Sequence, residues 1–213
     1  MNSATQSLTL QGVAGSLEAL RDVPPDGLVR GTVVIAHPHP LFGGTMQNKV
    51  VQTLARAFVQ CGWQAVRFNF RGVGASAGVY DEGQGEAADM LSVIAQVAPT
   101  GPLALAGFSF GAFVTSHVLQ QLGEHRAPEK VVLVGTAASR FAVAPIAPEW
   151  HERTLVLHGE QDDTVPLASV MDWARPQSLP VTVIPGVEHF FHGQLPLLKS
   201  LVVRHALAPV QAG

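Results

Sequence analysis

The sequence is poor in cysteine, in charge and in long apolar runs, and each shortage excludes a class of protein. Cys61 is the only cysteine among 213 residues, which excludes an internal disulfide framework. Only 14% of the residues are charged and the formal net charge is −3, so the chain lacks the basic excess that binds nucleic acid or anionic membranes. No apolar run reaches the roughly 18 residues that cross a bilayer. We therefore expect neither a nucleic-acid partner nor a membrane partner.

The beginning of the chain also lacks a targeting signal. Residues 1–6 have neither the basic start nor the apolar core of a signal peptide. A single unpaired cysteine is compatible with a reducing compartment. These two observations predict a cytoplasmic protein, and they leave its oligomeric state open.

Apolar residues, in contrast, make up 47% of the chain. A chain of this length is expected to form one domain, residues 1–213. Short β-branched runs alternate with helical stretches, which is typical of an α/β fold with βαβ units. We predict a mostly parallel, twisted sheet of about eight strands with helices on both faces. Strands are expected at 7–10, 16–22, 32–36, 64–69, 103–107, 130–134, 154–157 and 181–184, and helices at 48–61, 83–97, 110–122 and 195–205.

Residues 107–111 carry the first indication of chemistry. They read Gly-Phe-Ser-Phe-Gly and match the pattern G-x-S-x-G. The match lies between a predicted strand and a predicted helix, a context that holds a serine hydroxyl exposed on a tight turn. The flanking glycines let such a turn close, and the helix N-terminus favours developing negative charge. Ser109 is therefore the predicted nucleophile, the alternative being a plain helix-capping serine.

In folds that place the serine on a Gly-x-Ser-x-Gly turn between a parallel strand and a helix, the acid follows the serine along the chain and the histidine comes last. Asp162 lies in the loop after the predicted strand 154–157, at the edge of the sheet where catalytic groups gather. We predict Asp162 as the acid, with Asp163 as the alternative. Glu160 fits better as a loop carboxylate.

The base should come from a loop that reaches both the serine and the acid. His189 lies just after the predicted strand 181–184 and is flanked by apolar residues. We predict His189 as the base and His192 as the alternative.

Two backbone N–H groups should stabilise the oxyanion of the tetrahedral intermediate. Phe110, the residue after the nucleophile, supplies the first. The second is expected from the loop 37–44, where prolines have no N–H and leave His39 or Leu41. We favour His39, because it stands two residues past His37 at the end of the strand. No third ligand at a suitable spacing accompanies these histidines, so neither a metal nor a cofactor is expected.

Several segments together resemble the α/β-hydrolase superfamily. Within it, they are similar to small, cap-less bacterial hydrolases related to dienelactone hydrolase and to short esterase or acyl-peptidase domains. Dienelactone hydrolase itself has a cysteine nucleophile, whereas this chain has Ser109. The segments are 37–46 (HPHPLFGGTM), 48–51 (NKVV), 67–74 (RFNFRGVG), 107–111 (GFSFG), 158–166 (HGEQDDTVP) and 188–193 (EHFFHG).

The substrate pocket is expected to be open and apolar. The segment 135–153 between two predicted strands is too short for a cap domain and should form one apolar wall. Such a pocket has no obvious group to recognise a charge and suits a small ester or acyl substrate. The predicted pocket residues are Leu41, Phe42, Phe141, Trp150 and Phe190.

These features predict a serine hydrolase that cleaves small carboxylic esters or thioesters through an acyl-enzyme on Ser109. A peptidase or an acyltransferase could use the same triad. A non-enzymatic binding domain of the same fold is the alternative from another class.

Overall fold

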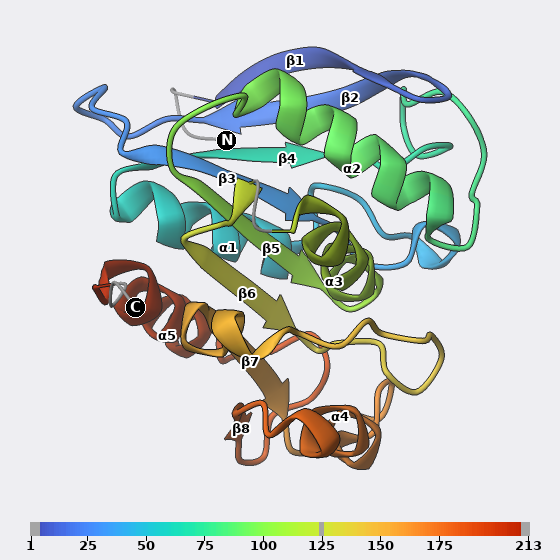
Figure 1. Ribbon diagram of the computed structural model, residues 1–213, viewed down its shortest axis with the longest axis vertical. Helices are drawn as coiled ribbons and strands as arrows, with labels where there is room; N and C mark the ends of the chain where they lie inside the picture. The colour runs from blue at the N-terminus through green and yellow to red at the C-terminus, as the bar shows by residue number, and fades with distance from the viewer. Residues whose placement is uncertain (1–4, 124–125, 210–213) are drawn as a thin grey trace.

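The computed structural model describes residues 5–123 and 126–209. Its centre is one eight-stranded sheet with the order β1-β2-β4-β3-β5-β6-β7-β8 (Figure 1). The β1–β2 hairpin and the β2–β4 pair are antiparallel, and all other neighbours are parallel. This confirms the predicted fold class. The strands are β1 (Thr5–Gly12), β2 (Gly15–Asp22), β3 (Gly31–Ala36), β4 (Trp63–Phe68), β5 (Leu103–Phe108), β6 (Lys130–Val134), β7 (Thr154–Gly159) and β8 (Val181–Ile184).

The central strands are buried on both faces. Every residue of β3, β5 and β6 is buried, as expected for parallel strands covered by helices on each side. Successive side chains of a strand point to opposite faces, so Val34 and Ile35 of β3 belong to two different hydrophobic clusters. The unbroken apolar runs of the sequence are explained by this two-sided burial.

Helices cover both faces of the sheet, as predicted. Helices α1 (Lys49–Gln60) and α5 (Leu195–Leu207) pack with Ile35 on one face. Helices α2 (Gln84–Val97), α3 (Phe110–Leu122) and α4 (Leu167–Ala174) pack on the other. Each helix contributes an apolar side to one of the two clusters.

The parallel arrangement brings the functional loops to one edge. The arrowheads of β3, β5, β6 and β7 point the same way in Figure 1. The loops that follow β3, β5, β7 and β8 therefore meet at that edge, where ligands of open α/β sheets bind. Residues 135–153 join β6 to β7 with only a 3-10 helix (Pro148–Arg153), so no cap domain lies between these strands.

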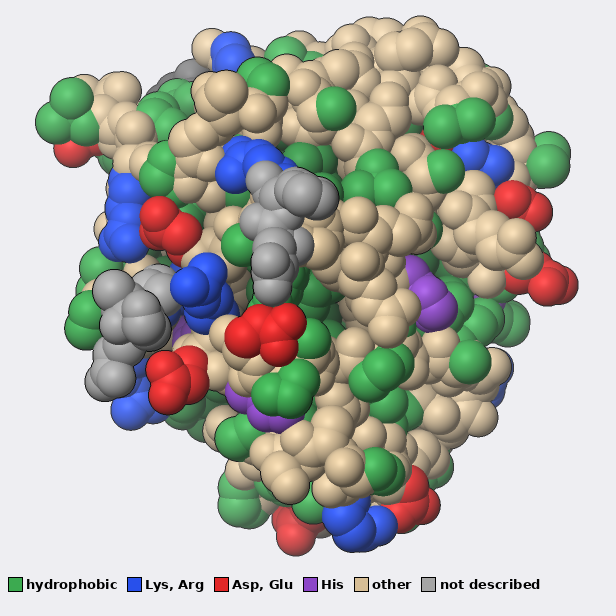
Figure 2. All heavy atoms as spheres, in the orientation of Figure 1, with side chains coloured by type: hydrophobic (Ala, Val, Ile, Leu, Met, Phe, Trp, Pro, Cys, Tyr) green, Lys and Arg blue, Asp and Glu red, His purple; other side chains and the backbone are tan. Residues whose placement is uncertain are grey.

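The surface has no single charged face in the view of Figure 2, where basic and acidic side chains lie interspersed. In the part of the chain that the structure describes, none of the helices combines the length and apolarity needed to cross a membrane.

Candidate active site

Ser109 stands on a tight turn between β5 and α3. Its backbone has φ 57° and ψ −115°, a conformation that is strained for any residue but glycine. A Cβ added at Gly107 would lie 2.3 Å from the carbonyl oxygen of Gly111, and one at Gly111 would lie 2.3 Å from that of Ala36. The two glycines therefore let the turn close on itself and pack against β3.

Ser109, His189 and Asp162 form one hydrogen-bonded chain. Ser109 Oγ lies 3.0 Å from His189 Nε2, and His189 Nδ1 lies 2.6 Å from Asp162 Oδ2. An ionised carboxylate can only accept, so Nδ1 carries the proton and Nε2 is left to accept from the Ser109 hydroxyl. All three side chains are buried. The structure thus brings together the three residues that were predicted from the sequence as nucleophile, base and acid.

The alternative acids and base make hydrogen bonds elsewhere. Asp163 is exposed and accepts from the Thr164 hydroxyl at 3.4 Å. Glu160 accepts from the Gly186 N–H at 2.9 Å, as a loop carboxylate. The exposed His192 lies 3.1 Å from Glu188.

Asp162 is held by its own loop, and a second histidine, His158, lies beside it. Its Oδ1 accepts from the backbone N–H groups of Thr164 at 3.0 Å and Val165 at 2.7 Å. His158 Nε2 donates to the Val165 carbonyl at 2.9 Å and lies 3.5 Å from Asp162 Oδ2. Burial lowers the pKa of His158 and keeps it neutral. The sequence analysis did not place His158 beside the acid, although a histidine at the end of a buried strand was a signal for this position.

The two backbone N–H groups predicted to stabilise an oxyanion are those of Phe110 and His39. Phe110 is the first residue of α3, so its N–H has no partner within the helix. Among the described residues, neither Phe110 N–H nor His39 N–H donates to another backbone carbonyl. The Leu41 N–H, in contrast, donates to His39 Nδ1 at 3.2 Å. Of the two candidates in that loop, His39 keeps its donor available.

His37 fixes the course of the same loop. Its Nε2 accepts from the Phe70 N–H at 3.0 Å, and its Nδ1 donates to the Pro38 carbonyl at 2.6 Å. Burial lowers the pKa of His37 to about 4, against the raising effect of the Pro38 hydrogen bond. The neutral imidazole of His37 therefore links Pro38, the residue before His39, to Phe70 just after β4.

A cavity of about 300 Å³ opens beside Ser109. Three of the predicted pocket residues, Phe42, Phe141 and Phe190, line it. The remaining lining residues are Pro38, His39, Gly43, Gly44, Asn48, Ser109, Phe110, Ala137, Arg140, Thr164, Val165 and His189.

Comparison with known protein families identifies the superfamily to which the chain belongs. The family model Hydrolase_4, described as serine aminopeptidase S33, matches residues 27–151, more than half of the 213 residues. The chain belongs to the α/β-hydrolase superfamily.

Solved structures place this α/β hydrolase in the cap-less group. An α/β serine hydrolase without lid from Xanthomonas campestris is 34% identical, with a TM-score of 0.87 over 100% of this chain and 98% of its own. An α-β serine hydrolase homologue from Coxiella burnetii is 38% identical, with a TM-score of 0.80 over 95% and 97% of the two chains. An uncharacterised protein of Rickettsia prowazekii is 30% identical over 174 residues, which are 74% of this chain and 71% of that protein.

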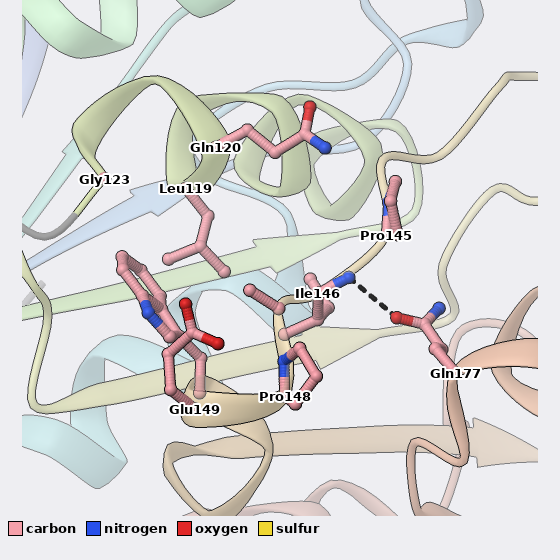
Figure 3. A pocket seen from close by; sticks show the side chains of 10 residues that line it. Leu119, Gln120, Gly123, Pro145, Ile146, Pro148, Glu149 and Gln177 are labelled. Atoms are coloured by element: carbon pink, nitrogen blue, oxygen red, sulfur yellow. Dashed lines mark hydrogen bonds between the residues drawn. The ribbon is translucent and has the colours of Figure 1, made fainter.

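Two predicted pocket residues of the hydrolase do not line the cavity beside Ser109, and for these two the prediction was wrong. Leu41 lies in the middle of the 3-10 turn Pro40–Phe42, which directs its side chain to solvent and leaves it 66% exposed. Trp150 lies in the 3-10 helix Pro148–Arg153, which turns it into the same cluster as Ile146. There it lines a separate cavity of about 600 Å³ (Figure 3). In that cavity the Ile146 N–H donates to Gln177 Oε1 at 2.7 Å.

The expectation of a pocket without a charged group was also wrong. Arg140, in the turn after β6, lines the cavity. Within residues 5–123 and 126–209, no group of three or more His, Cys, Asp and Glu side chains is arranged to hold a metal ion.

Proposed function

We propose that this α/β hydrolase cleaves small carboxylic esters or thioesters through an acyl-enzyme on Ser109. The observation that carries the proposal is the buried chain from Ser109 through His189 to Asp162, which ends at a cavity of about 300 Å³. Such a chain activates a hydroxyl that is otherwise a weak nucleophile.

In the acylation half-reaction, Ser109 Oγ attacks the carbonyl carbon of the substrate while His189 Nε2 takes the hydroxyl proton. Asp162 accepts from Nδ1–H, which orients the imidazole and stabilises its charged form. The N–H groups of Phe110 and His39 donate to the oxyanion. His189 then gives its proton to the departing alcohol or thiol, and the acyl group remains on Ser109.

Water completes the cycle. His189 Nε2 takes a proton from the water that attacks the acyl carbon, and the second tetrahedral intermediate uses the same two N–H donors. Its collapse releases the carboxylic acid and returns the proton to Ser109 Oγ. Every proton transfer uses side chains of this chain, so the cycle needs no cofactor.

The family description raises an aminopeptidase as the second candidate. An aminopeptidase must recognise a free α-ammonium group, for which a carboxylate is the natural partner. In residues 5–123 and 126–209, no Asp or Glu lines the cavity, and Arg140 would repel a cation. The lining therefore favours an ester or thioester over a peptide with a free amino terminus.

Covalent labelling tests the proposal most directly. A fluorophosphonate should label wild-type protein at Ser109 with one equivalent, and Ser109→Ala should not be labelled. His189→Ala should retain the fold and lose most labelling, because the hydroxyl then has no base. A folded wild-type protein that is not labelled and turns over neither p-nitrophenyl acetate nor a short acyl thioester would favour the non-enzymatic binding domain.

A further inference from the structure

Among the residues that the structure describes, Arg140 is the only Lys or Arg that lines the cavity beside Ser109. It follows β6 in the turn that leads to Phe141, and its backbone N–H donates to the Ala137 carbonyl at 3.2 Å. The described lining residues include no acidic side chain that could neutralise it. The cavity therefore has a positive end.

An aromatic wall supports this guanidinium. The Arg140 guanidinium carbon lies 5.9 Å from the centre of the Phe42 ring, a cation–π distance. The Phe42 ring lies 4.7 Å from His39, and His39 lies 4.9 Å from Phe110. The rings connect the guanidinium to the two residues that carry the proposed oxyanion donors.

The donors of Arg140 are not used within the part of the chain described. There the side chain forms no ion pair, whereas Arg67, Arg71 and Arg175 each pair with an aspartate. Its charge nevertheless acts on the site: after burial, the charge of Arg140 is the second cause that lowers the pKa of His39. Arg140 is exposed, and it is close enough to the cavity for its charge to act on His39.

We propose that Arg140 determines specificity by pairing with a carboxylate of the substrate, so that this hydrolase prefers esters or thioesters that carry a free carboxylate. The inference rests on the proposed function. A planar guanidinium can bind a carboxylate through two parallel hydrogen bonds while the ester carbonyl lies at Ser109. The carboxylate can belong to the acyl group, as in a monoester of a dicarboxylic acid, or to the alcohol.

Matched substrate pairs separate these two sources. On the acyl side, p-nitrophenyl monoglutarate is compared with the p-nitrophenyl ester of glutaramic acid, after subtraction of the rate without enzyme. On the alcohol side, 4-carboxyphenyl butyrate is compared with 4-carbamoylphenyl butyrate. Each pair differs only in carboxylate against amide, so the ratio of the two kcat/KM values reports the recognition of charge.

We expect wild-type protein to favour the carboxylate by roughly two- to fivefold in at least one pair, the size of an ion pair at an exposed site. Arg140→Gln should reduce that ratio to about 1, and Arg140→Lys should retain part of it. Arg56→Gln serves as the matched control, because Arg56 is exposed on α1, does not line the cavity and changes the net charge equally. It should leave the ratio and both kcat/KM values unchanged.

Two results would overturn the inference. The role of Arg140 is contradicted if wild-type protein shows no preference for the carboxylate in either pair. It is also contradicted if Arg140→Gln retains that preference. In both cases, turnover of the amide partners would leave the proposed function standing. Absence of turnover of all four esters, together with no fluorophosphonate label on Ser109, overturns the proposed function and this inference with it.

Discussion

Asp162 and Asp163 are neighbours in the chain with opposite surroundings. Asp162 is buried and accepts three hydrogen bonds, one of them from His189, whereas Asp163 faces solvent. We expect Asp162→Asn to lower kcat by roughly 10⁴, because an amide favours the wrong imidazole tautomer. Asp163→Asn should cost about tenfold or less. The measurement is kcat on one short ester, and a larger loss in Asp163→Asn would contradict the proposed role of Asp162.

His39 allows a backbone role to be separated from a side-chain role. Its φ is −53°, within the range of proline, so His39→Pro removes the N–H with little change of the backbone. We expect His39→Pro to lose roughly 10²–10³ in kcat, the cost of one oxyanion donor. His39→Ala keeps the N–H and should stay within about tenfold of wild type.

The comparison uses kcat on the same ester, with circular dichroism to confirm that each variant is folded. A folded His39→Ala protein as inactive as His189→Ala would show that the imidazole of His39 takes part in the chemistry.

At the residue scale, the sequence specified the groups whose order and spacing are tied to a turn. Ser109, Asp162 and His189 could be identified because each lies in the turn or loop that follows a predicted strand. Arg140 and Trp150 were not readable in the same way, because a loop residue can point to either side depending on the turn that carries it. Trp150 turned inward and Arg140 turned to the cavity, and no periodicity in 135–153 indicated either.

At the scale of elements, the apolar pattern of the sequence was sufficient to locate several strands and helices. The bounds predicted for β6 and β8 are those observed, and α3 matches the predicted helix 110–122. Strand β1 extends over Thr5–Gly12 rather than 7–10, because its pairing with β2 continues through polar residues that carry no apolar signal. Strand pairing with a neighbour cannot be seen in one segment alone.

The contact between α3 and β3 is a second element-scale feature, and Gly111 makes it possible. A Cβ at this position would lie 2.3 Å from the Ala36 carbonyl oxygen, a backbone atom that a side-chain rotation cannot move. We expect Gly111→Ala to lower the free energy of unfolding by about 3 kcal/mol and to reduce kcat, because the helix that carries the Phe110 N–H must shift. Urea denaturation measures the first effect and ester hydrolysis the second.

Gln120→Ala, on the exposed side of the same helix, is the control and should change neither quantity appreciably. A Gly111→Ala protein as stable and active as wild type would contradict the tight approach of α3 to β3.

For the whole molecule, the absence of a cap domain between β6 and β7 limits how much substrate can be enclosed. The cavity beside Ser109 holds about 300 Å³ and has no lid to cover a long chain. We expect kcat/KM on p-nitrophenyl esters to be highest for C2–C4 acyl groups and to fall as the chain lengthens. A higher kcat/KM for a C12 ester than for a C4 ester would contradict this expectation.

The stability of the whole molecule should depend on pH through its buried histidines. Burial lowers the pKa of both His37 and His205 to about 4 in the folded protein. An unfolded histidine titrates near pH 6.5, so the unfolded chain binds protons that the folded chain refuses between about pH 6.5 and pH 4. The free energy of unfolding should therefore fall as the pH drops through this window, by about 3 kcal/mol for His37.

Urea denaturation at intervals from pH 7.5 to pH 4 measures the slope. His37→Gln should reduce it, and His192→Gln, which replaces an exposed histidine, should not. A free energy of unfolding that stayed constant from pH 7 to pH 5 would contradict the role of the buried histidines.

The three residues of the hydrogen-bonded chain at Ser109 are synthesised at different times. His189 follows Ser109 by 80 positions and Asp162 by 27, and the loop that carries it comes after β8, the last strand to be synthesised. A nascent polypeptide can form the turn at Ser109 while the imidazole that activates it is still unmade. Under the proposed mechanism, the hydroxyl is not activated until β8 has joined β7 at the edge of the sheet, because His189 follows β8. In the proposed function, acylation of Ser109 therefore requires a complete sheet, and a chain whose β8 has not yet been made would not cleave esters.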